Sequence, residues 1–146
     1  MRISTKGRYG LRIMLELALR HGQGPVLVEL LERSQGISGK YIHQLMPGLR
    51  HAGLVRTVRG PHGGYELARS PEEITILEIV TVLEGPPVPV ECVARPAACG
   101  RTGECVTHDL WCEVAAAIEG VLSQVTLAEL CRRQRQRGQE PLSFSI

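Results

Sequence analysis

The order of the patterns in the first half of this 146-residue chain restricts its fold more than any other feature. Ser4 precedes a stretch, ending near Leu19, in which apolar residues recur every three or four positions, as on one face of an α-helix. A shorter helical pattern ends at Gly36, and a third follows Ser38 and ends at Ala52. Both serines are suited to cap a helix N-terminus. Two helices joined by a glycine-containing turn predict a helix-turn-helix unit.

A β-hairpin is predicted directly after the third helix. Residues 54–59 (LVRTVR) and 65–67 (YEL) alternate apolar and polar side chains, and residues 60–64 (GPHGG) are typical of a turn. A helix-turn-helix followed by a hairpin is the winged-helix arrangement, and here Arg59 and His62 lie at the wing tip. Three helices and a hairpin can also be a purely structural unit, so the pattern alone leaves both interpretations open.

The charge distribution favours a polyanionic partner for the first half of the chain. Residues 1–70 carry eleven Lys and Arg against four Glu, a balance of +7, whereas residues 71–131 carry two Arg against ten acids, a balance of −8. Such asymmetry is typical of a chain in which one part meets a polyanion. An ordinary solvated basic surface is the alternative. Because the basic half coincides with the winged-helix pattern, double-stranded DNA is the favoured partner.

The second half predicts a short helix, a loop and a long helix. Thr75 and Glu78 form a capping-box pattern at the start of a helix that ends at Glu84, before a Pro- and Gly-rich loop. Apolar residues then recur at helical spacing in a stripe: Trp111, Val114, Ala115, Ile118, Val121, Leu122 and Val125. This stripe has to be buried, either against the first helix of the same chain or against a second copy in a two-fold dimer.

We therefore expect a mainly α-helical fold with a small β-hairpin, a winged helix-turn-helix plus a long C-terminal dimerisation helix. The expected parts are a DNA-binding domain (1–84), a cysteine-bearing loop (85–106), a dimerisation helix region (107–131) and a basic, flexible tail (132–146). Nothing in the sequence resembles a secretory signal or a membrane span, so a cytoplasmic protein is expected.

Four of the five cysteines lie between Cys92 and Cys112. In a reducing compartment such a cluster is more typical of metal or redox chemistry than of disulfides. Six residues separate Cys92 from Cys99, and five separate Cys99 from Cys105. Two separate Cys105 from His108. Thiolates and imidazole suit zinc, copper(I) or iron–sulfur clusters. Because zinc sites usually pair their ligands more closely, the spacing favours an iron–sulfur cluster, but zinc and inert thiols stay open.

Three separated segments carry a family resemblance. They are the opening MRISTKGRYGLRIMLELA, the wing segment GLVRTVRGPHGGYEL and the run from Cys92 through CVTHDLW. In this order they are similar to the dimeric winged-helix regulators of bacteria that include IscR, NsrR and CymR, and to the IscR-like members in particular. The resemblance implies a homodimer that binds a palindromic operator and carries a 2Fe–2S cluster in each subunit. It also implies that the cluster-bound protein represses iron–sulfur assembly genes and that cluster loss relieves the repression.

The cluster ligands that the resemblance implies on this chain are Cys92, Cys99, Cys105 and His108. The first cysteine interval is one residue longer than in the IscR pattern, and Cys112 adds a thiol that is an alternative fourth ligand. NsrR-like members take an acidic ligand from the first helix, where this chain has Arg8, which cannot bind iron. CymR-like members lack the cysteine trio. Both observations favour the IscR-like arrangement.

The winged-helix interpretation also assigns DNA contacts. Bases are expected to be read from the outward side of the third helix and from the wing, and phosphates to be bound by basic side chains. The expected DNA-binding residues are Lys6, Ser38, Lys40, Tyr41, His43, Gln44, Arg56, Arg59, Pro61 and His62. Pro47 lies inside the third helix, where it removes one backbone hydrogen bond, so we expect a kink or an early end there.

An iron–sulfur electron carrier or redox enzyme is the alternative from another class of protein. The chain has no phosphate-binding glycine loop, nucleotide fingerprint or Ser/His/Asp pattern, so the sequence predicts a regulator and not an enzyme. In a regulator, ordering of the cysteine loop next to the dimer helix is expected to change the spacing of the two DNA-reading units.

Overall fold

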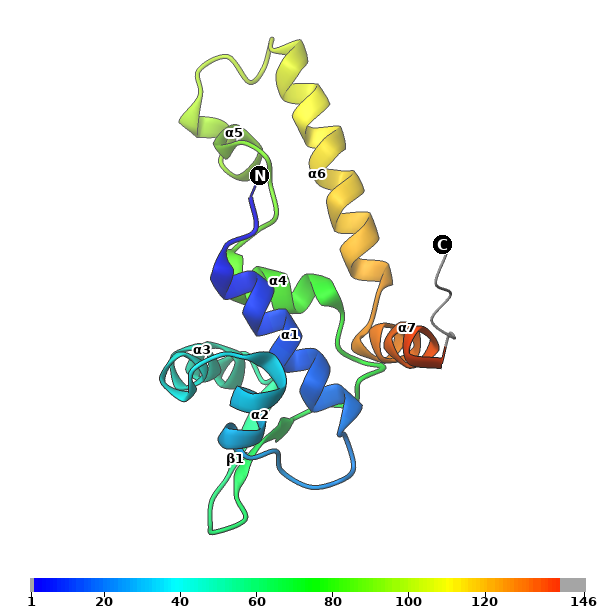
Figure 1. Cartoon of the computed structure of the whole chain (residues 1–146). Coiled ribbons are helices and arrows are strands. Elements are labelled where there is room, and N and C mark those ends of the chain that lie inside the picture. Colours follow the sequence, from blue (N-terminus) through cyan, green and yellow to red (C-terminus); the bar gives the residue numbers. More distant parts are fainter. Residues whose placement is uncertain (1, 140–146) are drawn as a thin grey trace, which may run out of the picture.

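The computed structural model describes residues 2–139, which form a mainly helical chain with one two-stranded antiparallel sheet (Figure 1). The elements are α1 (Thr5–Leu19), α2 (Val28–Gln35), α3 (Gly39–His51), β1 (Val55–Val58), β2 (Gly64–Leu67), α4 (Ile76–Glu84), the short α5 (Glu91–Ala94), the 3-10 helix η1 (Pro96–Ala98), α6 (Val106–Gln124) and α7 (Leu127–Gln139). This order confirms the predicted winged helix-turn-helix followed by a long helix. The loop expected around the cysteines contains the two short helices α5 and η1.

Side-chain caps set the beginning of three helices. Ser4 and Ser38 each accept, through Oγ, the backbone N–H of the residue three positions later, at 3.4 and 3.2 Å. Thr75 and Glu78 form a complete capping box, in which Glu78 Oε2 accepts the Thr75 N–H at 3.0 Å. These side chains satisfy N–H groups that the first turn of a helix leaves without an internal partner. Local sequence therefore fixes where α1, α3 and α4 begin.

Strand β2 of the hairpin is tied to the chain that enters α2. The two strands pair with Val55 opposite Leu67. On the other side of β2, Val26 and Tyr65 exchange two backbone hydrogen bonds of 2.8 and 2.9 Å. A Cβ at Gly64 would lie only 2.1 Å from the Val26 carbonyl oxygen, so this approach requires glycine. The wing therefore projects from a fixed base.

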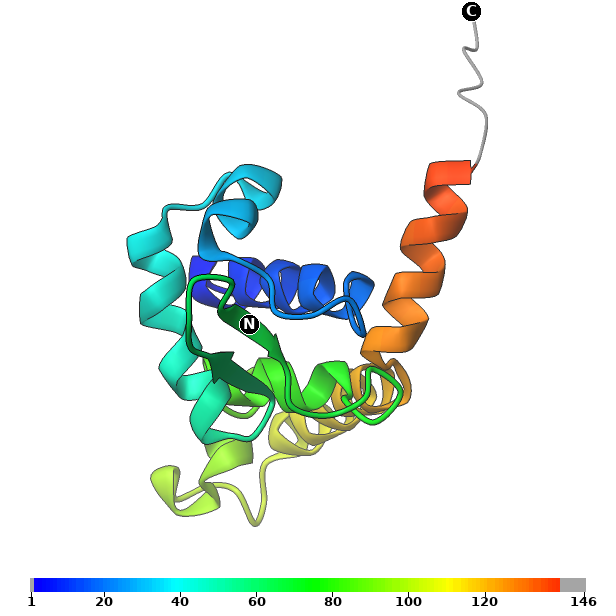
Figure 2. The same ribbon diagram turned by 90° about the horizontal axis from the view of Figure 1, so that it is seen from below.

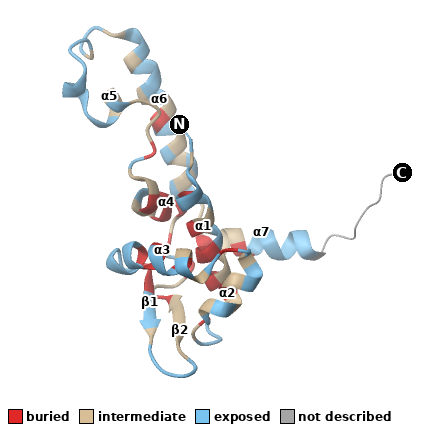
Figure 3. Ribbon diagram, turned by 60° about the vertical axis from the view of Figure 1, so that its left-hand side comes forward, coloured by how far each residue is buried: buried red, intermediate tan, exposed pale blue. Residues whose placement is uncertain are grey.

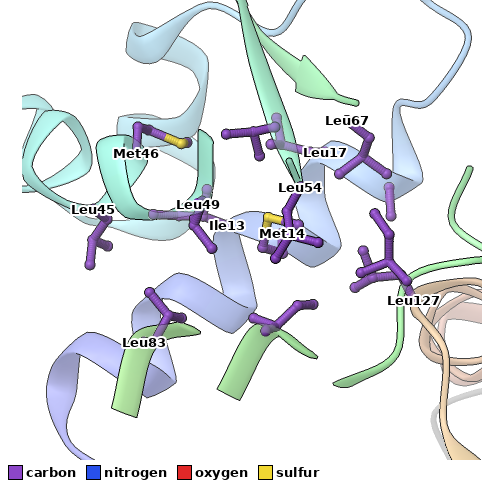
Figure 4. Packing of buried hydrophobic residues seen from close by; sticks show 14 of the residues in the cluster. Ile13, Met14, Leu17, Leu45, Met46, Leu49, Leu54, Leu67, Leu83 and Leu127 are labelled. Atoms are coloured by element: carbon purple, nitrogen blue, oxygen red, sulfur yellow. The ribbon is translucent and has the colours of Figure 1, made fainter. Parts of the chain in front are cut away.

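One hydrophobic core joins α1, α3, α4 and the hairpin to the start of α7, as Figure 4 shows. Its labelled members include Ile13, Met14, Leu17, Leu45, Leu49, Leu54, Leu67, Leu83 and Leu127. Leu127 is fully buried, and its N–H donates to the Ile74 carbonyl at 2.9 Å. Burial of such a side chain stabilises a fold by about 1.5–3 kcal/mol. The chain that leaves α6 is thus anchored in the winged-helix core.

Helix α6 extends away from this core and carries the cysteine loop at its N-terminal end (Figures 1 and 3). It packs against α4 and α5 rather than α1. Ala115 is the buried residue of α6, whereas Leu110, Trp111 and Val121 remain exposed. The alternative in which the apolar stripe packs on the first helix is therefore not realised.

Helix α7 corrects the expectation of a flexible basic tail, because it continues to Gln139. Glu129 pairs with Arg132 at 2.6 Å and with Arg133 at 2.9 Å, and these hydrogen bonds lower the pKa of Glu129 to about 2. Pairs three and four residues apart support an exposed helix. Residues 140–146 of the expected tail lie outside the described residues. Figure 2 shows that α7 and α3 lie on opposite sides of α1.

Of the kink or early end expected at Pro47, the early end does not occur, because α3 continues to His51. Pro47 is exposed, so its ring does not disturb the core. The buried face of α3 holds the helix in place through Ile42, Leu45, Met46 and Leu49. None of the helices in the described chain is long and apolar enough to cross a membrane.

Candidate DNA-binding surface and metal site

The outward face of α3 carries the residues predicted to read bases. Lys40, His43 and Gln44 are all exposed, opposite the buried face of the helix. Ser38 is exposed as well, but its oxygen is occupied by the cap, so its hydroxyl proton is the group left to donate to DNA. In winged helices the N-terminal half of this helix enters the major groove. The described structure brings these four side chains to that half of α3.

Tyr41 makes a contact with α1 that the sequence did not predict. It is half-buried and meets Tyr9 of α1 edge to face, with ring centroids 6.1 Å apart. The guanidinium groups of Arg8 and Arg12 lie 5.9 and 5.5 Å from the centre of the Tyr9 ring. Two positive charges therefore lie next to the tyrosine pair at the start of α3. Arg8 is exposed and is a candidate for phosphate binding that was not predicted from the sequence. The signal that could have found it is its spacing of four residues from Arg12, which puts both arginines on the same face of the helix.

The wing presents three exposed residues at its tip, Arg59, Pro61 and His62, and Figure 3 shows the hairpin tip as exposed. Arg56 differs, because its Nε donates to Glu66 Oε1 at 2.7 Å across the hairpin. A guanidinium already paired with a carboxylate attracts phosphate less than a free one. Arg59 is thus the stronger candidate for a wing contact, and Lys6 in the first turn of α1 is exposed in the same way.

The cysteine loop places one imidazole between two thiols. Cys92 lies on α5, and His108 and Cys112 lie one helical turn apart on α6. His108 Nδ1 is 3.2 Å from Cys92 Sγ, and His108 Nε2 is 3.5 Å from Cys112 Sγ. Cys92 and Cys112 are partly exposed and both are free thiols. The structure therefore places one thiol beside each nitrogen of the His108 imidazole.

In the described chain, no hydrogen bond joins the thiol of Cys99 or Cys105 to the Cys92 thiol, the Cys112 thiol or the imidazole ring of His108. Cys99 is exposed after η1, whereas Cys105 precedes α6 and lies 3.0 Å from the Thr107 hydroxyl. This hydrogen bond, together with the backbone N–H of His108, holds the pKa of the Cys105 thiol below its ordinary value.

Across residues 2–139, no three metal-binding side chains are arranged to hold an ion. The thiols and the imidazole fit a soft metal or an iron–sulfur cluster in their chemistry. The predicted set of Cys92, Cys99, Cys105 and His108 is not assembled as a coordination shell.

The two candidate sites lie at opposite ends of the described molecule, with the wing at one end and the cysteine loop at the other (Figures 1 and 3). A physical connection joins them. Glu84, the last residue of α4, precedes the cysteine loop and accepts backbone N–H groups of Ser4 and Gly7, each at 2.9 Å. These residues belong to the N-terminal end of α1, which carries Lys6 and Arg8.

The winged-helix fold, with basic and polar side chains on the exposed face of α3, on α1 and at the wing, defines a DNA-binding transcription regulator. Comparison with known proteins identifies its family. Residues 3–133 match the Rrf2 family, which is described as an iron-dependent transcriptional regulator. The chain belongs to the Rrf2 family.

The chain is similar to two kinds of Rrf2 regulator. It is 43% identical to the transcriptional regulator CymR of Bacillus subtilis over 89% of each chain. A structure of that protein, described as the global cysteine regulator of B. subtilis, superposes with a TM-score of 0.80 at 41% identity, covering 91% of this chain and 98% of the other.

It is also 39% identical to the transcriptional regulator IscR of Serratia proteamaculans, over 92% of this chain and 81% of that protein. The structure of T. potens IscR gives a TM-score of 0.77 at 37% identity, covering 99% and 95% of the two chains. These relatives confirm the expected regulator and weigh against the enzyme alternative.

Proposed function

We propose that this Rrf2 regulator senses iron–sulfur cluster status through a 2Fe–2S cluster held by Cys92, Cys99, Cys105 and His108. The position of His108 between two thiols at the start of α6 carries the proposal, because each ring nitrogen lies beside a thiol and both imidazole and thiolate are ligands of soft metals. The family description as iron-dependent and the similarity to IscR support it. When bound, the cluster supplies an iron centre whose oxidation or loss depends on cellular conditions.

The loop has the freedom that ligand assembly requires. Residues 94–101 are all exposed, so Cys99 can approach His108 without loss of core packing. Cys105 lies at the start of the same helix as His108, and its lowered pKa favours the thiolate that metal binding needs. His108 has to be neutral to act as a ligand. Cys112 is the alternative fourth ligand, because it contacts the second ring nitrogen of His108.

The exposed apolar residues of α6 support a homodimer. In the single chain, Val121 has 64% of its surface exposed and Leu110 has 50% exposed, and Trp111 is exposed as well. A second copy of α6 supplies a matching stripe, and a two-fold dimer places two α3 helices so that they can read the two halves of a palindromic operator. Residues 107–131 would then be the dimerisation region, and residues 1–84 the DNA-binding domain.

In this proposal, α4 and α1 transmit the effect of cluster binding to DNA binding. Ordering of the loop after Glu84 changes the position of the Glu84 carboxylate, which holds the N-terminal end of α1. Lys6 and Arg8 on that end contact phosphate, while α3 and Arg59 read the grooves. We expect the cluster-bound dimer to repress genes of iron–sulfur cluster assembly, and the cluster-free dimer to release them.

The similarity to CymR, a structure of which is described as that of a global cysteine regulator, favours a second candidate that does not depend on an iron–sulfur cluster. This second candidate is a regulator of the same fold that uses zinc or thiol oxidation at the clustered cysteines. Purification without oxygen separates the two. The proposed function predicts a coloured protein with two iron and two sulfide per subunit, about the stoichiometry of one such cluster. A colourless protein with one zinc and no sulfide would establish the second candidate instead.

Ligand variants test the assignment of the fourth position. His108→Ala should alter or abolish the visible absorbance more than Cys112→Ala does, and the reverse ranking would reassign the ligand to Cys112. Cys131→Ala is the matched control, because this thiol is buried in the core and lies outside the loop. Its spectrum should equal that of the unchanged protein.

A further inference from the structure

A polar contact joins the wing to the outward face of α3. The Tyr65 hydroxyl of β2 lies 3.0 Å from His43 Nδ1 of α3, with the two rings 6.1 Å apart and tilted by 60°. His43 is exposed and Tyr65 is half-buried, so the histidine faces outward while the tyrosine supports it from behind. His43 was predicted from the sequence to read bases, whereas no role was predicted for Tyr65.

Both partners of this contact have fixed backbones. Tyr65 exchanges two hydrogen bonds with Val26 and pairs with Thr57 of β1, so its backbone is held on both sides. His43 follows Ile42, which is fully buried in the core. The fold thus sets the distance between the hydroxyl and the imidazole before any DNA is bound, and preorganised groups of this kind determine specificity most effectively.

The hydrogen bond restricts where the imidazole proton lies. A neutral imidazole has one N–H donor and one acceptor nitrogen, and a phenol hydroxyl is a good donor. An imidazole nitrogen accepts more strongly than a phenol oxygen does, which favours donation from the hydroxyl to Nδ1. The proton of the ring then lies on Nε2, which has no hydrogen-bond partner in the described chain. His43 accordingly presents an outward N–H.

We propose that Tyr65 is a positioning residue that fixes His43 as a hydrogen-bond donor to a base acceptor in the major groove. The acceptors available there are guanine N7 and O6, adenine N7 and thymine O4, whereas cytosine offers an N–H donor. The contacted base is therefore a purine or thymine, and cytosine is rejected. This inference rests on the proposed placement of α3 in the major groove.

The proton position is measured directly by nitrogen-15 NMR of the histidine side chains in the full-length protein, near pH 8. The unchanged protein should show His43 with its proton on Nε2. Tyr65→Phe removes only the hydroxyl and should give a mixture of the two forms. Tyr9→Phe is the matched control, because the Tyr9 hydroxyl makes no hydrogen bond in the described chain. A proton on Nδ1 in the unchanged protein would overturn the inference.

Base choice is measured by selection of bound duplexes from a random library, followed by sequencing. His43→Ala should lose the rejection of cytosine at one position in each half-site, by about 2- to 10-fold, the range of a single hydrogen bond. Tyr65→Phe should weaken the preference at the same position, and the double variant should equal His43→Ala. The inference would be overturned if His43→Ala and Tyr65→Phe lost base preference at different positions, or if Tyr65→Phe lost no preference at all.

Two further variants distinguish failure of this inference from failure of the proposed placement of α3. If Lys40→Ala and Gln44→Ala change DNA binding but the His43 and Tyr65 variants do not, the placement stands and the positioning role is wrong. If none of the four variants alters DNA binding, the placement of α3 is itself wrong. Thermal unfolding of each variant shows that it is folded.

Discussion

Glu84 Oε1 accepts the backbone N–H of Gly7 at 2.9 Å, which joins the last residue of α4 to the first turn of α1. The same oxygen accepts the N–H and the hydroxyl of Ser4. A Cβ at position 7 would lie 2.3 Å from this oxygen, so glycine permits the contact. Because the cysteine loop begins immediately after Glu84, the contact links the loop to the helix that carries Lys6.

Replacing Glu84 with Gln should lower the free energy of unfolding by about 1 kcal/mol at pH 7, since hydrogen bonds to a charged acceptor are stronger than neutral ones and solvent screens part of the gain. The hydrogen bond from the Ser4 side chain, with those from the backbone and the nearby Lys6, holds the pKa of Glu84 below its ordinary value. A carboxylate whose pKa is depressed in the folded protein stabilises the fold at pH values above its unfolded-state pKa of about 4.3. This stabilisation is lost as the pH falls through the pKa of the folded state.

The difference between Glu84→Gln and the unchanged protein, measured by urea unfolding, should therefore shrink toward zero between pH 5 and about pH 3. Glu73→Gln is the control, because Glu73 is exposed and its side chain makes no hydrogen bond in the described chain. Gly7→Ala should destabilise by about 1–3 kcal/mol, and less than additively with Glu84→Gln, because both changes remove the same contact. A pH-independent difference would contradict the role assigned to Glu84.

Pro47→Ala should stabilise the protein by roughly 1–3 kcal/mol, because alanine restores the backbone hydrogen bond inside α3 and proline costs about 3 kcal/mol in a helix interior. Pro47 is exposed, so the change leaves no cavity. Urea unfolding measures the gain. Pro61→Ala at the wing tip, outside any helix, should show none. An unchanged or lowered stability in Pro47→Ala would mean that α3 depends on the proline.

Val121→Glu should convert the proposed dimer into a monomer, because the side chain is 64% exposed in the single chain and a charge there is buried only when a second α6 covers it. Light scattering after size exclusion measures the mass, and DNA affinity should fall together with it. Gln124→Glu adds the same charge at an exposed position outside the apolar stripe and should leave the mass unchanged. A Val121→Glu protein that keeps the mass of two chains would argue against pairing through α6.

The five thiols of the metal-free protein should react in a defined order with iodoacetamide. Cys99, which is exposed, and Cys105, whose lowered pKa favours the reactive thiolate, should be modified first, whereas Cys131 is buried and burial raises the pKa of its thiol. Modification of Cys131 should appear only at the rate of unfolding, as followed by mass spectrometry of peptides. Early modification of Cys131 would show that α7 detaches from the core in solution.

The fold was predictable because its signals are local. Ser4, Ser38 and Thr75 all cap the helices that the sequence predicted, and the Gly-rich turn gave the hairpin. Residues 132–139, which form part of α7, were predicted as a flexible tail because the arginine run was weighed as charge alone, whereas the pairing of Glu129 with Arg132 supports a helix. Of the kink or early end expected at Pro47, the early end did not occur, because the buried face of α3 outweighs one missing hydrogen bond.

The candidate sites were less predictable, since they depend on contacts between distant segments. The spacing of Cys105 and His108 suggested a metal site, but only the fold shows that His108 meets Cys92 and Cys112 together. The contact between His43 and Tyr65 crosses from a helix to a strand, and nothing in either local pattern predicts it.

The most direct test of the central claim compares DNA binding by the same protein with its cluster intact and with its iron removed. Protein purified without oxygen is titrated against duplexes selected from a random library, at one fixed salt concentration, before and after chelation of iron. The proposed function predicts about a tenfold or larger change in affinity, or a different preferred sequence, and restoration of the first behaviour when the cluster is rebuilt. Equal affinity and the same preferred sequence in both states would contradict it.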